Sequence, residues 1–248
     1  GNGEVTVRGN VSSGDGMWKS VDAGKTWEHI GLEKSRHIPR VRIHPKNSDI
    51  VFAAVLGDLY KPSDERGVFK SIDAGKNWSH LGLEKSRNIG RIIVHPSNPD
   101  IVYVAAMGSL FANNEERGVF KSVDGGKTWE KTLYLSDSTG CIDLAIHPSA
   151  PNIVYAAMWQ RIRRPNKRQY GGESCGIYRS VDSGNTWVEL TDGLPKKDIG
   201  RIGLALAASA LACIVATSAC SSATVWPTSL PASACFKAAS FFFRSPIA

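Results

Sequence analysis

The chain repeats one eight-residue phrase four times: Ser20-Val-Asp-Ala-Gly-Lys-Thr-Trp27, Ser71-Ile-Asp-Ala-Gly-Lys-Asn-Trp78, Ser122-Val-Asp-Gly-Gly-Lys-Thr-Trp129 and Ser180-Val-Asp-Ser-Gly-Asn-Thr-Trp187. In the shared pattern S-x-D-x-G-x-[TN]-W, the Asp side chain is suited to accept hydrogen bonds from the backbone N–H groups that follow it, and Gly readily adopts positive φ. The apolar and polar residues before the phrase, as in Val119-Phe120-Lys121-Ser122, are typical of a strand, and the Trp begins another strand. Each phrase is therefore predicted to form the corner of a β-hairpin.

The spacing of the four phrases indicates a repeat protein. Their Asp residues lie 51, 51 and 58 residues apart, in the range expected of four-stranded propeller blades. Aligning residues 20–70 on 71–121 without gaps gives 30 identities in 51 positions, which indicates a duplication. The sequence therefore predicts an all-β fold of about four antiparallel, four-stranded β-propeller blades.

The phrase resembles the Asp-box, or BNR repeat, of sialidase-type and sortilin-type β-propellers. The chain is most similar to the sortilin-type repeats of bacterial envelope or secreted proteins, some of which are labelled glycoside hydrolases. Other phrases that carry this resemblance are Gly3-Glu4, Gly14-Asp-Gly16, Gly90-Arg91, Glu116-Arg-Gly118, Ala156-Ala-Met-Trp-Gln160 and Gly200-Arg-Ile-Gly203. The resemblance covers residues 1 to about 206, and it implies a propeller with more blades than the four corners present here.

The resemblance also implies that the boxes are architectural and lie away from the usual ligand site. The box residues with this expected role are Asp22, Gly24, Trp27, Asp73, Gly75, Trp78, Asp124, Gly126, Trp129, Asp182, Gly184 and Trp187. We expect their Trp side chains to fill the space between blades, because a blade buries its faces only by stacking on its neighbours.

Each unit contains two further apolar runs, which we expect to be the inner strands A and B. The first run ends in His-Pro at 40–45, 91–96 and 143–148, and the second follows, as at 101–107. Propeller topology then places the starts of the A strands on one face with the B–C connections 57–66, 108–117 and 159–176. The boxes, which join strands C and D, are expected on the other face.

Composition is that of an ordinary soluble globular domain, with 248 residues, 42% hydrophobic content and a net charge of +7. This positive net charge is compatible with an anionic partner. Three of the five cysteines fall after residue 206, and the remaining pair, Cys141 and Cys175, is too little to indicate an oxidising compartment. A disulfide between these two stays open, although strand B is expected to separate their strands. The chain begins abruptly and without a signal peptide, so we interpret it as a fragment.

The repeat pattern stops after Leu206. Residues 207–248 are rich in Ala, Ser and Cys, carry only Lys237 and Arg244 as charges, and contain no box. The apolar run 202–216 is shorter than the ~20 residues of a membrane-spanning helix, so no membrane span is predicted. We therefore divide the chain into 1–206, the propeller blades, and 207–248, a disordered or loosely helical and non-native segment such as a reading-frame error would produce.

One candidate ligand site is a ring of A-strand starts. Arg40, Arg91 and Arg201 occupy equivalent positions, and Asp143 takes that position in the third unit. Guanidinium groups near the channel mouth would suit carboxylate, sulfate or phosphate. The alternative is that each Arg pairs with a neighbouring acid or carbonyl and closes the channel.

A second candidate is the third B–C connection, which places five cations among aromatic residues: Trp159, Arg161, Arg163, Arg164, Lys167, Arg168 and Tyr170. Such a patch would attract an anionic glycan or a peptide acid, whereas one loop makes nucleic acid an unlikely partner. A solvated basic loop is the alternative.

Catalysis would require paired carboxylates, about 5–5.5 Å apart in a retaining and about 6.5–9.5 Å apart in an inverting glycosidase. The candidates are Glu4, Asp58, Asp64, Glu65, Glu115, Glu116, Asp143 and Glu173. The sequence selects no pair, and Asp143 is the candidate catalytic carboxylate that we would test first, because it breaks the Arg pattern. Glu-Arg-Gly repeats at 65–67 and 116–118, which favours a structural turn.

No metal site or cofactor is predicted, since His44, His95 and His147 fall in separate units. Two functions remain open. The favoured one is a non-catalytic module that recognises a peptide, protein or glycan, and the alternative is a fragment of a xyloglucanase-like or sialidase-like glycoside hydrolase. The resemblance implies a secreted, periplasmic or cell-envelope location.

Closure of the ring is also open. Residues 201–206 either begin another blade of a larger propeller or supply the missing A strand of the first blade in a four-blade ring.

Overall fold

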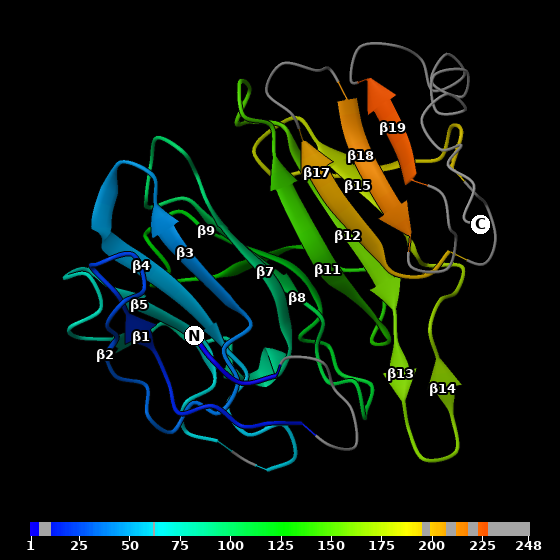
Figure 1. The fold of residues 1–248 in the computed structure, drawn as a ribbon. Helices are drawn as coiled ribbons and strands as arrows, with labels where there is room; N and C mark the ends of the chain where they lie inside the picture. Colours follow the sequence, from blue (N-terminus) through cyan, green and yellow to red (C-terminus); the bar gives the residue numbers. More distant parts are fainter. Residues whose placement is uncertain (5–10, 62, 195–198, 207–211, 218–222, 228–248) are drawn as a thin grey trace, which may run out of the picture.

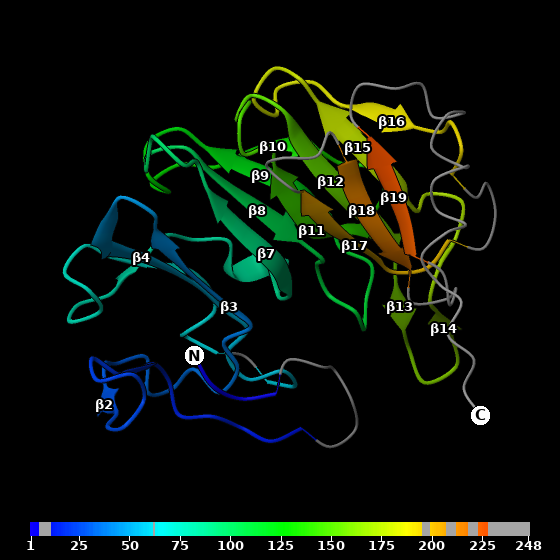
Figure 2. The same ribbon diagram turned by 45° about the horizontal axis from the view of Figure 1, so that its top comes forward.

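The computed structural model describes residues 1–4, 11–61, 63–194, 199–206, 212–217 and 223–227. Its strands form antiparallel sheets that lie side by side in chain order, along an arc that does not close (Figures 1 and 2). The one helix among these residues is the 3-10 turn η1, Glu84–Ser86. The prediction of an all-β, propeller-type fold is therefore confirmed.

Three blades are complete. In each one the strands pair in the order A, B, C, D, from the inner strand outward. The first complete blade contains β3 (Arg40–His44), β4 (Asn47–Val55), β5 (Gly67–Ser71) and β6 (Ser79–His80). The next contains β7 (Ile89–Val94), β8 (Val102–Ala106), β9 (Gly118–Ser122) and β10 (Glu130–Leu133). The third contains β11 (Thr139–Ile146), β12 (Val154–Gln160), β15 (Gly176–Ser180) and β16 (Val188–Leu190).

Parts of two further blades flank these three. The two-stranded sheet of β1 (Trp18–Lys19) and β2 (Glu28–His29) is the outer hairpin of the first box. At the other end, β17 (Ile202–Leu206) pairs with β18 (Ala212–Thr217), which pairs with β19 (Ala223–Pro227). We call the five units blades 1 to 5 in chain order.

The alternative in which residues 201–206 close a four-blade ring is wrong. Residues 201–206 do not complete blade 1, because β17 pairs with β18 and lies against β11 and β12, far from β1 and β2 in both views (Figures 1 and 2).

The segment after residue 206 was expected to be disordered or loosely helical. Within it, the backbones of β18 and β19 are extended strands. The rest, 207–211, 218–222 and 228–248, lies outside the described residues. The domain boundary at residue 206 stays a prediction.

The boxes lie at the end of each sheet opposite the starts of the A strands. In blade 3, Arg91 pairs with Ala105, which pairs with Val119, whereas the box residue Ser122 pairs with Val102 at the far end. The same register recurs in the neighbouring blades. The residues at the A-strand starts are therefore separated from the boxes by the length of a blade.

Each box is a closed hydrogen-bond unit. In the third box, Asp124 Oδ1 accepts from Thr128 N at 2.9 Å and from Ser122 Oγ at 2.8 Å, while its Oδ2 accepts from Thr128 Oγ1 at 2.6 Å. Ser122 Oγ in turn accepts from Gly126 N at 2.8 Å. Because these bonds stabilise the carboxylate, they hold the pKa of all four box Asp residues below its usual range, to about 2 for Asp22 and Asp73. The box carboxylates are thus fully engaged within the corner.

The box tryptophans link successive blades, as predicted for three of the four. Trp78 Nε1 donates to Ile30 O and Trp129 Nε1 to Leu81 O, both at 2.7 Å and both in the preceding blade. Trp187 Nε1 reaches Thr132 Oγ1 at 3.3 Å in the same way. Trp27 differs, because no described blade precedes it: its side chain is 59% exposed and donates to Gly24 O within its own box.

A second set of links runs in the other direction and was not anticipated. Lys19 Nζ donates to Ala74 O at 3.3 Å, Lys70 Nζ to Gly125 O at 3.2 Å and Lys121 Nζ to Asn185 Oδ1 at 2.6 Å. Each Lys precedes a box and reaches the box of the next blade. Its recurrence in step with the boxes was the signal available in the sequence.

The histidines of the His-Pro phrases belong to the A–B turns. His95 Nδ1 accepts from Ser97 N at 3.3 Å, and His147 Nδ1 accepts from Ser149 N at 3.2 Å. Cys141 and Cys175 are both buried, free thiols in β11 and in the connection before β15, with β12 between these strands as expected.

Candidate functional site

A pocket of about 190 Å³ opens where the inner strands of blades 2 to 5 begin. We call it the channel-mouth pocket. Its lining combines three arginines and Asn88 with mainly apolar groups: Pro39, Arg40, Leu56, Asn88, Ile89, Gly90, Met107, Leu110, Ile142, Trp159, Arg161 and Arg201. Four of the nine predicted ligand-binding residues therefore meet here, namely Arg40, Trp159, Arg161 and Arg201.

The A strands of adjacent blades approach closely at this pocket. A Cβ added to Gly90 would lie 2.3 Å from Ile142 O, so only glycine permits this backbone contact. A β-bulge at Gly90 shifts the register of β7, and an equivalent bulge at Ile142 shifts that of β11. Both bulges re-aim the following residues, Arg91 and Asp143.

The three arginines of the pocket differ in their freedom. Arg40 uses Nε to donate to Gly90 O and Nη1 to donate to Pro39 O, both at 3.2 Å. Arg201 is exposed and makes no hydrogen bond or ion pair with another described residue. Of the two, Arg201 is therefore the freer cation.

Arg161 is the most firmly held arginine of the pocket. Its guanidinium lies 3.9 Å from the ring centre of Tyr170 and 5.5 Å from that of Trp159. Its Nη1 donates to Gln169 O at 3.1 Å, and Trp159 Nε1 donates to Tyr170 O at 2.7 Å, which fixes the two rings. Arg161 is only 6% exposed, and this burial lowers the pKa of its guanidinium. The result is a pre-positioned cation at the edge of the pocket.

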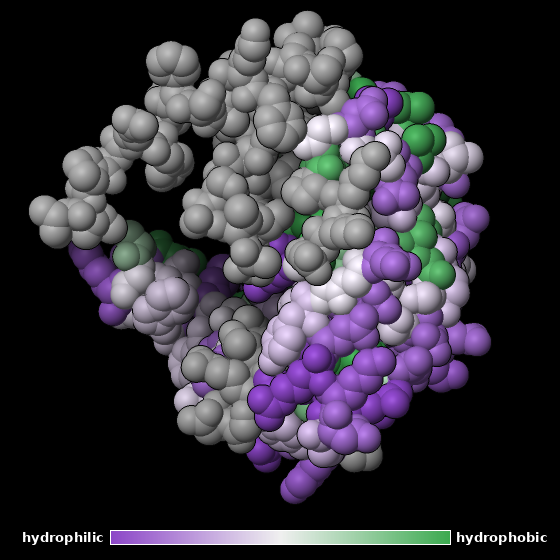
Figure 3. All heavy atoms as spheres, turned by 90° about the vertical axis from the view of Figure 1, so that its right-hand side faces the viewer, coloured by the Kyte–Doolittle hydropathy of each residue, from purple (hydrophilic) through white to green (hydrophobic). Residues whose placement is uncertain are grey.

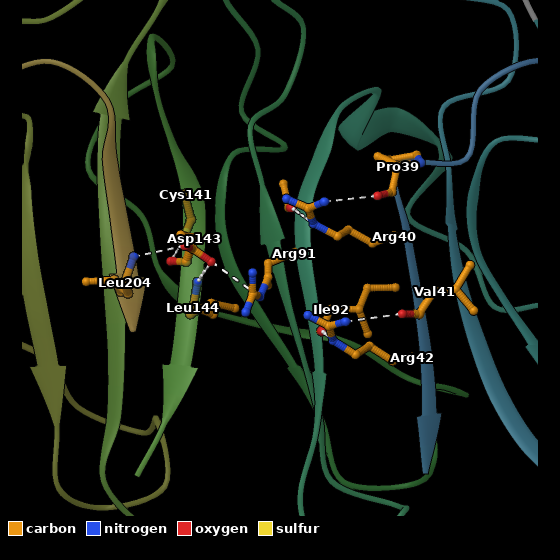
Figure 4. Close-up of polar contacts among 11 residues, drawn as sticks. Pro39, Arg40, Val41, Arg42, Arg91, Ile92, Cys141, Asp143, Leu144 and Leu204 are labelled. Atoms are coloured by element: carbon orange, nitrogen blue, oxygen red, sulfur yellow. Dashed lines mark hydrogen bonds and ion pairs between the residues drawn. The ribbon is translucent and has the colours of Figure 1, made fainter. Parts of the chain in front are cut away.

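Arg91 and Asp143 do not line this pocket but join three blades to one another (Figure 4). Arg91 Nε lies 3.4 Å from Asp143 Oδ1, which also accepts from Leu144 N at 2.9 Å. Asp143 Oδ2 accepts from Leu204 N in blade 5 at 2.9 Å. With a side chain 15% exposed, Asp143 is engaged on both oxygens. This geometry favours the inter-blade alternative for Arg91 and Asp143 over direct contact with a ligand.

Arg42 makes an equivalent link that sequence reasoning missed. Its Nε donates to Ile92 O in the next blade at 3.1 Å, and Nη1 donates to Val41 O at 3.3 Å (Figure 4). Alternation along the strand puts Arg40 and Arg42 on one face of β3, which was the available signal. Arg42 and Arg91 also line a second hollow of about 430 Å³ beside the inner strands.

The basic third B–C connection is more ordered than a solvated loop. It contains a small hairpin of β13 (Ile162–Arg163) and β14 (Arg168–Gln169). Arg163 N donates to Leu110 O at 2.7 Å, and Arg164 Nη2 donates to Asn113 Oδ1 at 2.7 Å, so both are tied to blade 3. Figure 3 shows hydrophilic side chains gathered on the lower part of this side, at the level of the hairpin.

The remaining candidate acids are dispersed. Glu65 Oε2 accepts from Ser35 Oγ at 2.6 Å, and Asp58 Oδ1 accepts from Tyr60 N at 2.9 Å. Glu116 Oε2 accepts from Asn114 Nδ2 at 3.3 Å. None of the described residues that line the channel-mouth pocket is acidic.

The arginines of the repeated Glu-Arg-Gly phrase hold the B–C connections together. Arg66 donates to the carbonyls of Leu56, Asp58 and Lys61, and Arg117 to those of Ser109, Ala112, Ser138 and Arg161. Arg117 is fully buried, and burial lowers its pKa to about 10. The phrase therefore forms a structural turn, as the sequence indicated.

Within the described part of the chain, no group of three or more His, Cys, Asp and Glu side chains is placed to hold a metal ion. Nor is any described helix long and apolar enough to cross a membrane.

The sequence is similar to sortilin-type proteins and to xyloglucanases. The family model described as "Sortilin, neurotensin receptor 3" (Sortilin-Vps10) matches residues 15–141 and 66–201. A probable oligoxyloglucan-reducing end-specific xyloglucanase of Neosartorya fischeri is 29% identical over 181 residues, covering 71% of this chain and 19% of the relative. The vacuolar protein sorting/targeting protein 10 of Sordaria macrospora is 28% identical over 129 residues, covering 50% of this chain and 8% of the relative.

Solved structures share the fold. The GH74 enzyme of Niastella koreensis superposes with a TM-score of 0.60 at 17% identity, over 87% of this chain and 33% of that one. The GH74 xyloglucanase of Xanthomonas campestris gives 0.61 at 13% identity, over 88% and 34%. The chain thus spans about a third of these structures and less than a quarter of the xyloglucanases that it matches in sequence. Because the family model covers most of the blades described above, the chain belongs to the Sortilin-Vps10 family of Asp-box β-propellers.

Proposed function

We propose that this chain is part of a non-catalytic recognition propeller that binds a carboxylate-bearing ligand in the channel-mouth pocket. The observation that carries this proposal is the gathering of Arg40, Arg161 and Arg201 around an apolar lining without an acidic residue among the described ones. Guanidinium groups bind carboxylates through charge-assisted hydrogen bonds. The partly apolar surroundings strengthen such bonds relative to bulk water.

The lining favours a peptide or protein segment over a glycan. Leu56, Ile89, Met107, Leu110 and Ile142 offer no side-chain hydrogen-bonding groups. Sugar hydroxyls placed against them would lose their bonds to water, whereas an apolar side chain next to a carboxylate would gain by burial. An anionic glycan is the second ligand of this class, and nucleic acid is not favoured because the cations form one small cluster.

The alternative function is part of a glycoside hydrolase, and the xyloglucanase relatives support it. It requires a carboxylate pair, which the described lining of the channel-mouth pocket does not supply. Asp143 would be the first carboxylate to test, although both of its oxygens are engaged.

The test combines a random-peptide array and a glycan array with a hydrolysis assay on xyloglucan oligosaccharides. We expect the wild-type chain to bind acidic peptides without turnover, and Arg201→Gln to weaken binding about tenfold because one charge-assisted hydrogen bond is lost. Lys25→Gln, on the box face, is the matched control for the loss of one positive charge. Turnover by the wild type would reject the non-catalytic proposal, and equal binding by both variants would reject the pocket.

We also propose a secreted, periplasmic or cell-envelope location. The support is the membership in the Sortilin-Vps10 family.

A further inference from the structure

An ion pair of arginine and aspartate in the first of the duplicated units has no counterpart in the second. The connections between blades 1 and 2 and between blades 2 and 3 both contain Gly-Leu-Glu-Lys-Ser-Arg, ending in Arg36 and Arg87. Arg36 Nη1 lies 3.8 Å from Asp58 Oδ2. The residue aligned with Asp58, 51 positions later, is Ser109, which has no carboxylate. The second unit therefore has no carboxylate at the position of this internal partner.

Arg87 is left as an exposed cation. Among the described residues, none forms a hydrogen bond or ion pair with its side chain. Its backbone has φ 54° and ψ −59°, and Asn88 N donates across it to Ser86 O at 2.5 Å. This is a γ-turn of the rare positive-φ type, which is unfavourable for a residue with a side chain. Arg36 does not adopt a positive φ, so the strain is specific to Arg87.

Arg87 lines two hollows near the channel-mouth pocket. The inner one, about 10 Å³, shares Leu56 and Asn88 with that pocket and also contains Ser109 and Phe111. The outer one, about 400 Å³, shares Arg66 and Arg87 with the inner one; its other residues are Ser63, Glu84, Lys85, Asn114 and Glu116. The shared lining residues place the outer hollow beside the pocket, at the boundary between the B–C connections of blades 2 and 3. The inner hollow has room for about one water molecule, so a peptide would cross from one to the other over its outside.

The same boundary carries an aromatic pair. Tyr60 and Phe111 occupy aligned positions of the two B–C connections, and their ring centres lie 6.2 Å apart. Both rings are exposed, at 54% and 41%. An extended ligand that leaves the pocket beside Leu56 and Asn88 and crosses this boundary on the surface would meet the exposed Phe111 ring and the exposed Arg87 side chain.

We propose that Arg87 is a specificity-determining residue that binds a second acidic group of an extended peptide whose first carboxylate occupies the channel-mouth pocket. This inference rests on the proposed function. The charge pattern places the second acid at the inner end of the outer hollow, beside Arg87 and Arg66, because Glu84 and Glu116 repel an acid farther out. Arg66 donates to three backbone carbonyls and stays in place, so Arg87 supplies the variable contact.

The test uses two variants that act on Arg87 by different routes. Arg87→Gln removes the cation, and Ser109→Asp restores the internal partner that Arg36 already has. Ser109→Asn is the neutral control for the second change, and Arg36→Gln is the control for loss of a positive charge at a paired site. Circular dichroism melts check that each variant is folded.

The probes are random hexapeptides selected on the wild-type chain, followed by titration of the enriched peptide and of its two single-acid Gln analogues. We expect enrichment of peptides with two acidic residues. Arg87→Gln and Ser109→Asp should bind the two-acid peptide about 5- to 20-fold more weakly, and should bind the analogue that keeps only the first acid as well as wild type does. Both controls should match the wild type.

Three results separate this inference from the proposed function. If Arg87→Gln and Ser109→Asp bind the two-acid peptide with wild-type affinity while Arg201→Gln binds it more weakly, the role of Arg87 is overturned. The binding of a carboxylate in the channel-mouth pocket is then still supported. If Arg87→Gln weakens every peptide equally, Arg87 contributes only general charge and the specificity role is overturned. If the wild type enriches no acidic peptide, the proposed function fails and this inference fails with it.

Discussion

Asp143 is the residue at which a structural and a catalytic role give opposite expectations. Its carboxylate accepts from Leu144 N and Leu204 N, both at 2.9 Å, and faces Arg91 Nε at 3.4 Å. Hydrogen bonds to a charged group contribute about 1.5–3 kcal/mol each, and a partly exposed ion pair with an Nε–Oδ1 distance of 3.4 Å contributes less than about 1 kcal/mol. Water can replace part of these bonds after truncation, so we expect Asp143→Ala to lower the free energy of unfolding by about 3 kcal/mol.

In Asp143→Asn the amide oxygen still accepts from one of the two N–H groups. The expected loss is therefore about half as large, about 1.5 kcal/mol. For a chain of this length, about 1 kcal/mol corresponds to about 2–4 °C in Tm, so we expect decreases of about 6–12 °C for Ala and about 3–6 °C for Asn.

The assay is thermal unfolding followed by tryptophan fluorescence at pH 7, with Asp64→Asn as the matched control. Asp64 is exposed and makes no hydrogen bond or ion pair with another described residue, so its Tm should stay within about 1 °C of wild type. If Asp143→Asn melts with the control but abolishes turnover of a glycan, the inter-blade reasoning is refuted and the carboxylate acts on substrate.

Three further predictions concern the architecture. Trp129→Ala should lower the free energy of unfolding in urea by about 3 kcal/mol, because the indole packs on the preceding blade and donates to Leu81 O at 2.7 Å. Trp27→Ala is the control: this side chain is 59% exposed, so the free energy of unfolding should change by less than about 0.5 kcal/mol. Equal losses in the two variants would contradict the blade-linking role of Trp129. The box carboxylates have pKa values in the folded state below that of an ordinary Asp, so the stability they contribute is present above about pH 4 and is lost as pH falls toward about 2. Between these pH values, Tm should depend less steeply on pH in Asp124→Asn than in the wild type. An unchanged slope would refute a contribution of the Asp124 carboxylate to stability. Arg117→Lys should lower the free energy of unfolding by about 2–3 kcal/mol, because one ammonium group cannot reach the four carbonyl oxygens that accept hydrogen bonds from the guanidinium. Proteolysis within residues 108–117 should become faster, and a wild-type cleavage rate would count against this role of Arg117.

The sequence determined the fold class because its signal is local. Ser, Asp, Gly and Thr within one box satisfy one another's hydrogen bonds, so the motif specifies its corner without reference to the rest of the chain. Repetition at 51 residues then indicated blades, and the Glu-Arg-Gly repeat indicated a structural turn. The exception among the boxes, Trp27, shows the limit of this reasoning, since its burial depends on a neighbouring blade and not on its own motif.

Tertiary structure alone decided how the predicted site divides. Arg40, Arg91, Asp143 and Arg201 are equivalent in the repeat, yet Arg40 and Arg201 line the pocket while Arg91 and Asp143 join blades. The division depends on which backbone group of the next blade lies within reach, and the contact from Asp143 to Leu204 spans 61 residues. Periodicity assigns a residue to a strand and a face, but it contains no information about the distance between neighbouring sheets, and that distance determines which charges are paired and which remain free.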